Sequence, residues 1–179
     1  MYLVYLAAGR GSRLPKKYRQ IPKCLTQIKK KTIFERNVEF FNNFKTKIII
    51  TGYKRKKLSK LINKYKFKEV VNHKYEDTNM VHSLFSIKSL KKNEDIIVCY
   101  GDVIFKNDLY KKFKNIKGNV MPININWLSY WKKRMKIKMI KYDAENLIIK
   151  KKIVQSIGKK INKRFPRYQY MGVFKLSLK

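Results

Sequence analysis

The stretch YLVYLAAGRGSRL, residues 2–14, joins a short apolar run to a loop that holds two glycines. Residues 2–7 carry no charge, which is typical of a strand buried on both faces of a parallel sheet. In the loop, small residues let backbone N–H groups approach an anion, and Arg13 can add bidentate contacts to a phosphate. The stretch therefore indicates a phosphate-binding loop at the end of a strand, with a tight turn that binds nothing as the alternative.

Two better-known phosphate-binding patterns are not met by this loop. The dinucleotide fingerprint G-x-G-x-x-G needs a third glycine, and Leu14 stands in that place. The P-loop pattern, in which a lysine and a hydroxyl residue follow the second glycine, is absent as well. The sequence therefore speaks against a hydride-transfer enzyme and against a P-loop NTPase.

Outward from this stretch, apolar strand patterns alternate with helical ones. A capping box of Thr32 and Glu35 precedes a helix that contains Phe34, Val38 and Phe41 at helical spacing. Further strands are expected at residues 47–51, 69–71 and 95–100, and further helices at residues 56–65, after Asn79 and after Asn107. Such alternation predicts an α/β fold with a mostly parallel sheet.

Three loops follow the strongest of these strands, at residues 8–16, 52–54 and 101–105. Right-handed crossovers bring the carboxyl ends of parallel strands to one edge, where such sheets bind their ligands. Gly101 and Asp102 open the third loop, and a carboxylate there can hold a divalent cation beside phosphates or merely cap a turn. Lys23, after Pro22, can reach phosphates held by the first loop or remain a solvated side chain.

The chain is strongly basic, with 45 Lys and Arg against 11 Asp and Glu and a formal net charge of +34. One interpretation is nucleic-acid binding. The other is compositional drift, because Lys, Ile, Asn, Tyr and Phe are abundant together and their codons are rich in A and T. The lysines are spread over nearly the whole chain, so we favour drift, with anion affinity but no specific nucleic-acid partner.

Composition also bears on domain count and compartment. With 179 residues, 44% of them hydrophobic, and no Pro/Gly/Ser-rich linker, we expect one domain with its own core. Cys24 and Cys99 form no C-x-x-C pair, which speaks against a disulfide scaffold and a cysteine zinc site. The N-terminus lacks the features of a signal peptide, and no apolar run approaches the roughly 18 residues of a membrane span. A cytoplasmic protein is expected.

In combination, LAAGRGSRL, the Pro22-Lys23 pair and YGD at residues 100–102 resemble the signature of the nucleotidyltransferase family. That family makes nucleoside-diphosphate sugars and CDP-alcohols. KIIITGY (residues 47–53) is similar to the family's second strand and the loop after it. The stretches that resemble bacterial phosphocholine cytidylyltransferases are VNHKYEDTNMVHSL (71–84), NWLSYWKKR (126–134) and QYMGVFKLS (169–177). The resemblance covers nearly the whole chain.

The resemblance implies a fold, a reaction and a cofactor. The fold is the Rossmann-like three-layer αβα type of nucleotide-diphospho-sugar transferases, here as a single domain over residues 1–179. Its nucleotide-binding part would span about residues 1–115 and its acceptor-binding part about residues 116–179. The reaction is Mg²⁺-dependent transfer of a nucleoside monophosphate, CMP from CTP, onto a small phosphorylated acceptor with release of pyrophosphate.

The resemblance also assigns roles to single residues. Leu6, Ala7, Ala8 and Gly9 would contact base and ribose; Gly11, Ser12 and Arg13 would hold the β- and γ-phosphates; Asn79 and Ser83 would lie near the base. Lys23 matches the lysine that steadies the phosphates in the transition state, and Asp102 matches the first magnesium ligand. His73 and His82 receive structural roles, because the ionised acceptor phosphate needs no general base.

Two points of the resemblance leave alternatives. Trp127 and Trp131 share a helix face and would either wall an acceptor pocket, by cation–π contact with a choline-like group, or pack in a core. Family members usually continue into helices that supply a second metal-binding carboxylate, whereas no Asp or Glu follows Glu145 here. The alternatives are a truncated chain, a second ligand from elsewhere, or a domain that binds nucleotide without turnover.

Overall fold

The structure, a computed structural model, describes residues 1–12, 14–88, 90, 93–161 and 164–178. The chain divides into two compact units. Unit 1 comprises Met1–Val120 and Gly172–Lys179, and unit 2 comprises Met121–Met171. The predicted division into a nucleotide-binding part (about residues 1–115) and an acceptor-binding part (about residues 116–179) stays a prediction. The single domain remains a prediction.

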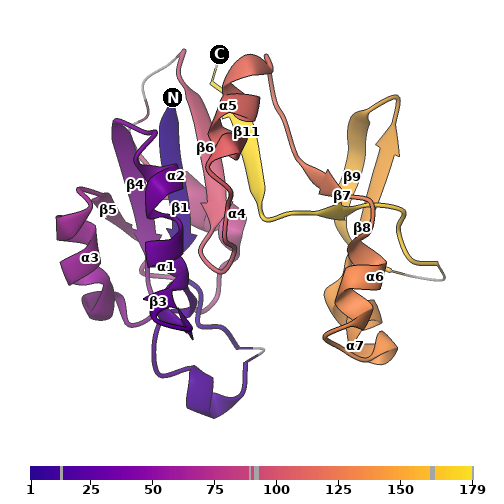
Figure 1. Cartoon of the computed structure of the whole chain (residues 1–179), viewed down its shortest axis with the longest axis horizontal. Coiled ribbons are helices and arrows are strands. Elements are labelled where there is room, and N and C mark those ends of the chain that lie inside the picture. Colours follow the sequence, from indigo (N-terminus) through magenta and orange to yellow (C-terminus); the bar gives the residue numbers. More distant parts are fainter. Residues whose placement is uncertain (13, 89, 91–92, 162–163, 179) are drawn as a thin grey trace. The chain divides into compact units, whose positions relative to one another are not determined.

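Unit 1 is built on a five-stranded, mostly parallel sheet (Figure 1). Its strands are β1 (Tyr2–Ala7), β4 (Thr46–Thr51), β5 (Lys68–Val71), β6 (Asp95–Tyr100) and β11 (Val173–Ser177). The order is β11-β6-β1-β4-β5. β6, β1, β4 and β5 run parallel, and β11 pairs antiparallel with β6. The predicted α/β fold is confirmed, and β1 and β6 have the predicted bounds.

Both faces of this sheet are covered. Successive side chains along β1 point to opposite faces of the sheet, and each set packs in a core of its own. Leu3 and Tyr5 pack with residues from α1 (Ile33–Arg36), α2 (Val38–Phe41), α3 (Ser59–Lys64) and α5 (Asp108–Asn115). Val4 packs on the other face, where Leu84 of α4 (Met80–Phe85) contributes. The αβα layering is thereby confirmed (Figure 1).

The helix expected after Thr32 is interrupted at Asn37. The Thr32–Glu35 capping box is present as predicted, but α1 ends at Arg36 and α2 begins at Val38. Asn37 is fully buried; its amide donates to the Val103 carbonyl at 2.8 Å, and its Oδ1 accepts from the Phe105 N–H at 2.8 Å. These two bonds anchor the chain just after Asp102.

Other elements of unit 1 are short. They are the 3₁₀ turns η1 (Lys16–Tyr18), η2 (Lys23–Leu25) and η3 (Arg55–Leu58) and the strands β2 (Gln27–Ile28) and β3 (Lys31–Thr32). The helix predicted at residues 56–65 occurs as η3 followed by α3. Asn107 precedes α5, but its side chain does not cap the helix and instead accepts a hydrogen bond from Asn43.

Unit 2 has a small core of its own. Its elements are β7 (Ile123–Asn124), α6 (Trp127–Lys132), α7 (Ile137–Asp143), β8 (Glu145–Lys150), β9 (Ile153–Lys160) and β10 (Gln169–Tyr170). β8 and β9 form an antiparallel hairpin, and β7 pairs with β10. Trp127, Ile140 and Ala144 form the buried core.

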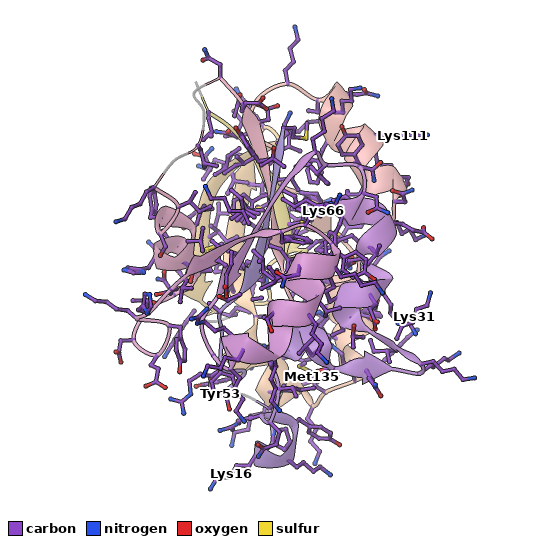
Figure 2. All side chains as sticks on the ribbon, turned by 90° about the vertical axis from the view of Figure 1, so that its left-hand side faces the viewer. Lys16, Lys31, Tyr53, Lys66, Lys111 and Met135 are labelled. Carbon is purple, nitrogen blue, oxygen red and sulfur yellow. The ribbon has the colours of Figure 1, made fainter. Side chains whose placement is uncertain are left out.

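Basic side chains project from many elements. Lys16, Lys31 and Lys111 lie toward the outline at separate parts of unit 1 (Figure 2). No helix within the described ranges is long and apolar enough to cross a membrane.

Candidate active site

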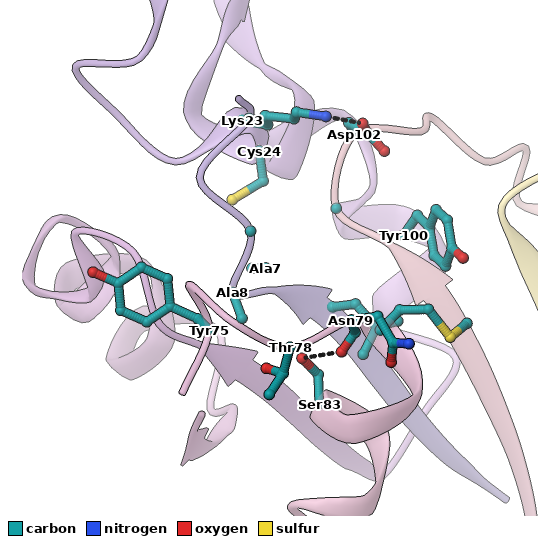
Figure 3. A pocket seen from close by; sticks show the side chains of 15 residues that line it. Ala7, Ala8, Lys23, Cys24, Tyr75, Thr78, Asn79, Ser83, Tyr100 and Asp102 are labelled. Atoms are coloured by element: carbon teal, nitrogen blue, oxygen red, sulfur yellow. Dashed lines mark hydrogen bonds and ion pairs between the residues drawn. The ribbon is translucent and has the colours of Figure 1, made fainter. Parts of the chain in front are cut away.

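A cavity of about 220 Å³ opens in unit 1 at the carboxyl ends of β1 and β6 (Figure 3). Leu6 and Ala7 of β1 line it together with Ala8, the residue after that strand, and so do Tyr100 at the end of β6 and Gly101 after it. After β1 the chain continues to β4 on one side, whereas β6 pairs on the other side. The cavity therefore lies at the topological switch point, where open α/β sheets bind ligands.

Two glycines allow the loops to come this close. The Gly101 N–H donates to the Leu6 carbonyl at 2.9 Å, and a Cβ on Gly101 would lie 2.6 Å from that oxygen. Gly11 has a φ of +66°, which disfavours other residues, and a Cβ there would lie 3.0 Å from the Lys23 Cε. The first loop is thus shaped so that Lys23 packs directly over its backbone.

Lys23 and Asp102 meet at this cavity although they are far apart in sequence. The Lys23 Nζ donates to the Asp102 Oδ2 at 2.9 Å (Figure 3). Both side chains remain accessible, at 26% and 38% exposure. An anion that enters the cavity can therefore replace Asp102 as the partner of Lys23, and a cation can replace Lys23 as the partner of Asp102.

The neighbouring thiol is inert and serves as an anchor. Cys24 lines the cavity but is 1% exposed, and burial raises the pKa of its thiol to about 12, with a smaller contribution from the Asp102 charge. The thiol therefore stays protonated at neutral pH, where it is a poor nucleophile and metal ligand. Its burial fixes the 3₁₀ turn η2 that presents Lys23.

The opposite wall is the segment between β5 and α4, and its polar side chains are largely committed to holding its shape. The Asn79 Oδ1 caps α4 by accepting from the N–H groups of Val81 and His82. The Ser83 hydroxyl donates to the Asn79 carbonyl at 3.2 Å and accepts from the Asn72 amide at 3.0 Å. Asn72, which the sequence reasoning missed, also donates to Thr78.

Comparison with known proteins identifies this arrangement. Residues 3–118 match the model of the MobA-like NTP transferase domain. The chain belongs to the MobA-like NTP transferase family. The match runs from the second residue of β1 to beyond the end of α5 and includes every residue that lines the cavity. The resemblance proposed from the motifs is confirmed.

Curated relatives of this MobA-like NTP transferase include two cytidylyltransferases. The CTP:phosphoglutamine cytidylyltransferase of Campylobacter jejuni is 31% identical over 99% of this chain and 73% of the relative. The choline-phosphate cytidylyltransferase of Streptococcus pneumoniae is 35% identical over 60% of this chain and 47% of the relative. A solved structure, the inositol-1-phosphate CTP transferase from T. maritima, is similar in fold, with a TM-score of 0.72 and 18% identity over 98% of this chain and 70% of that one.

Most site residues expected from the sequence come together in the MobA-like domain. Those that line the cavity are Leu6, Ala7, Ala8, Gly9, Gly11, Lys23, Asn79, Ser83 and Asp102. Ser12 is exposed and does not line the cavity, and Arg13 lies outside the described residues. Their roles toward a nucleotide remain predictions.

Sequence reasoning gave no role in the site to five side chains of the cavity wall, namely Cys24, Tyr75, Thr78, Met80 and Tyr100. Tyr75 packs so closely on Gly52 that a Cβ on that glycine would lie 2.7 Å from the tyrosine side chain. The available signal was an aromatic residue between polar ones in the stretch VNHKYEDTN. Its position over the cavity depends on a contact between two strand-end loops, which local sequence does not report.

The two tryptophans lie in α6 of unit 2 and differ in burial. Trp127 is 1% exposed, and its Nε1 donates to the Pro166 carbonyl at 3.0 Å. Trp131 packs edge-on against it at 5.3 Å and has the Arg134 guanidinium 4.9 Å from its ring centre. Trp127 thus packs in a core, which was one of the two expectations. Their role at an acceptor site remains a prediction.

The cavity offers little by itself to hold a metal. Within the described ranges, no three His, Cys, Asp or Glu side chains cluster as a metal site. Asp102 supplies one accessible carboxylate beside the glycine loop. That donor set fits Mg²⁺, which typically takes one or two protein carboxylates together with substrate phosphates and water.

Proposed function

We propose that the chain transfers CMP from CTP to a small phosphorylated acceptor and releases pyrophosphate. The family supports nucleotidyl transfer, and the names of the two curated cytidylyltransferases support CTP and a phosphorylated acceptor. The observation that carries the proposal is the Lys23–Asp102 pair at 2.9 Å beside the glycine loop. It joins one cation for phosphate and one carboxylate for a metal in a single cavity.

The reaction needs positioning and charge neutralisation more than proton transfer. An oxygen of the acceptor phosphate attacks the α-phosphorus of CTP, and the bond from that phosphorus to the oxygen bridging to the β-phosphate breaks. The attacking phosphate is already ionised at neutral pH, because its second pKa is about 6. The Lys23 ammonium would neutralise charge on the departing pyrophosphate, and the N–H group of Gly11 would bind a phosphate oxygen.

Asp102 would hold Mg²⁺ together with the nucleotide phosphates. When bound, the ion would supply positive charge next to the reacting phosphates. Lys23 would then leave Asp102 and contact phosphate, so the ion pair of the free protein would be replaced by two new charge contacts. This exchange keeps both groups neutralised before and after binding.

For the acceptor, we favour a phosphorylated amino-acid-like molecule over phosphocholine. The relative that is similar over 99% of this chain is named for phosphoglutamine, whereas the choline-phosphate enzyme matches 60%. In unit 2 the face of Trp131 already carries the Arg134 guanidinium. A quaternary ammonium would have to displace that cation to use the same ring.

A pyrophosphate-release assay tests the proposal. The protein with Mg²⁺ is given CTP, ATP, GTP or UTP, together with phosphoglutamine, phosphocholine or inositol 1-phosphate. We expect release with CTP that depends on the acceptor and is highest with phosphoglutamine. Release with another nucleotide would contradict the choice of CTP. Tight CTP binding by calorimetry without release from any acceptor would favour the alternative, a nucleotide-binding domain without turnover.

A further inference from the structure

A second cavity, of about 500 Å³, opens in unit 1 at the carboxyl ends of β4 and β5. Gly52 and Lys54 in its wall come from the loop after β4, to which the proposed reaction assigns no role. His73 and Tyr75 come from the loop after β5. We propose that this cavity binds a small anion that carries two or more phosphate groups, separately from the site at β1 and β6.

The charge of the cavity wall is the first argument. The stretch KRKK, residues 54–57, is the longest unbroken run of basic residues in the chain, and all four of its members line the cavity. Among the residues that the structure describes, no Asp or Glu lines it. A concave surface with one sign of charge concentrates ions of the opposite sign more strongly than scattered lysines do.

The pairing of these cations is the second argument. Arg55 pairs with Glu69 at 3.2 Å, and the Lys54 Nζ is held by the carbonyl and side-chain oxygens of Gln20. Within the part of the chain that the structure describes, Lys56 and Lys57 have no ion-pair partner. Two cations are thus fixed in the wall, and two are available to a ligand.

Neighbouring acids do not cancel this charge. Glu76 and Asp77 follow Tyr75 in sequence, but neither lines the cavity. Glu76 pairs instead with Arg10 of the first loop at 3.2 Å. The volume exceeds what one phosphate needs, and several phosphates can contact several of the basic side chains at once, which is why we infer a polyphosphate group.

Tyr75 lines both cavities, so the two cavities share part of one wall. The ring lies against Gly52, and its centre is 6.2 Å from that of Tyr53, whose N–H donates to the Ala8 carbonyl at 3.0 Å. Tyrosine fluorescence of the ring cluster can therefore report a ligand in either cavity.

The test is calorimetric titration with inorganic pyrophosphate at about 0.15 M salt, which screens non-specific attraction over about 8 Å. It uses the full chain with Lys23→Ala as background, to weaken pyrophosphate binding at the first cavity. Addition of Lys56→Ala and Lys57→Ala should weaken binding about tenfold, as expected for loss of two solvent-exposed charge contacts. The matched control, Lys111→Ala with Lys114→Ala on α5, removes the same charge and should change binding less than about twofold.

Each result decides the proposal. The proposal is supported if pyrophosphate binding is saturable, weakens in the variant that lacks Lys56 and Lys57, and is kept in the control. This result supports the second site whether or not the chain turns over CTP. Equal weakening by both double variants would show a general charge effect and overturn it, as would absence of saturable binding at this salt concentration. Orthophosphate that binds as tightly as pyrophosphate would overturn the polyphosphate specificity.

Discussion

The two units use apolar residues in opposite ways. In unit 1, β1 lies between two cores, and Leu3, Val4 and Tyr5 are fully buried. In unit 2, Ile148, Ile153, Val154 and Ile157 of the β8–β9 hairpin are between 39% and 63% exposed. A two-stranded hairpin is marginal by itself in water. The candidate active site therefore rests on a sheet that is covered on both faces, whereas unit 2 depends on a few side chains around Trp127.

The largest effect is expected from removing a ring at the centre of the unit 1 core. Phe34 is fully buried and contacts Tyr5, Phe41, Tyr65 and Phe67 through its ring. Phe34→Ala should lower the free energy of unfolding by about 3–5 kcal/mol, measured by urea denaturation. Phe85→Ala removes the same ring from a position that is 78% exposed and should cost about 0.5 kcal/mol or less. Similar costs for both variants would refute the assigned core.

Asp102→Asn tests whether the site of unit 1 needs this carboxylate. If the proposed reaction is correct, the variant should lose about 10²–10³-fold in the rate of pyrophosphate release, the scale of removing one group that stabilises transition-state charge. The control is Asp108→Asn, which alters an exposed acid that pairs with Lys112 on α5 outside the cavity. A loss smaller than about tenfold would count against Asp102 as the metal ligand.

Trp127→Ala probes the smaller core of unit 2. It should destabilise residues 121–171 by about 3 kcal/mol, the lower end for loss of a buried aromatic ring, because the core it fills is small; its Nε1 also bonds the Pro166 carbonyl. Hydrogen exchange should show faster exchange in α6 and α7, while amides of β1 and β4 keep their protection. Equal loss of protection in β1 would mean that the two units unfold together.

Alkaline pH should act on unit 1, since Cys24 and Cys99 both lie there. Burial raises the pKa of Cys24 from 9.0 to about 12, so the native state favours the protonated thiol. Stability from this group is complete below its unfolded pKa and is lost as pH rises toward 12, by about 1.4 kcal/mol between pH 8 and 10. Cys24→Ala should flatten this pH dependence in urea denaturation, and an unchanged slope would contradict the buried thiol.

The smallest effect is expected in nucleic-acid binding, where both units are basic and neither holds a recognised binding motif. Two DNA duplexes of equal length and different sequence should bind within about threefold of each other, because phosphate contacts carry no sequence information. Binding should fall steeply as salt rises toward physiological concentration. A sequence-preferring complex in band-shift titration that survives that salt would favour a nucleic-acid function.

The sequence predicted the parts of the fold that are buried on both sides. β1 and β6 were located to the residue because central parallel strands are continuous apolar runs. The break at Asn37 could not be predicted, since its cause is hydrogen bonding to the segment after β6. The motif indicates Gly9, Gly11, Lys23 and Asp102 as site residues. Tyr75 and Tyr100 line the cavity because of the way the folded chain positions them, which no local pattern indicates.

The chain leaves unit 1 at Val120 and returns at Gly172, and an isolated antiparallel bridge joins Val120 to Lys175, just after the point of return. Val120 and Lys175 exchange both backbone hydrogen bonds, at 2.9 and 2.7 Å. The points at which the chain leaves and re-enters unit 1 are therefore held side by side within unit 1, as in proteins that tolerate inserted domains. Residues 121–171 can then be viewed as a replaceable cassette. Evolution or an engineer could exchange it for another and leave the glycine loop, Lys23 and Asp102 in place.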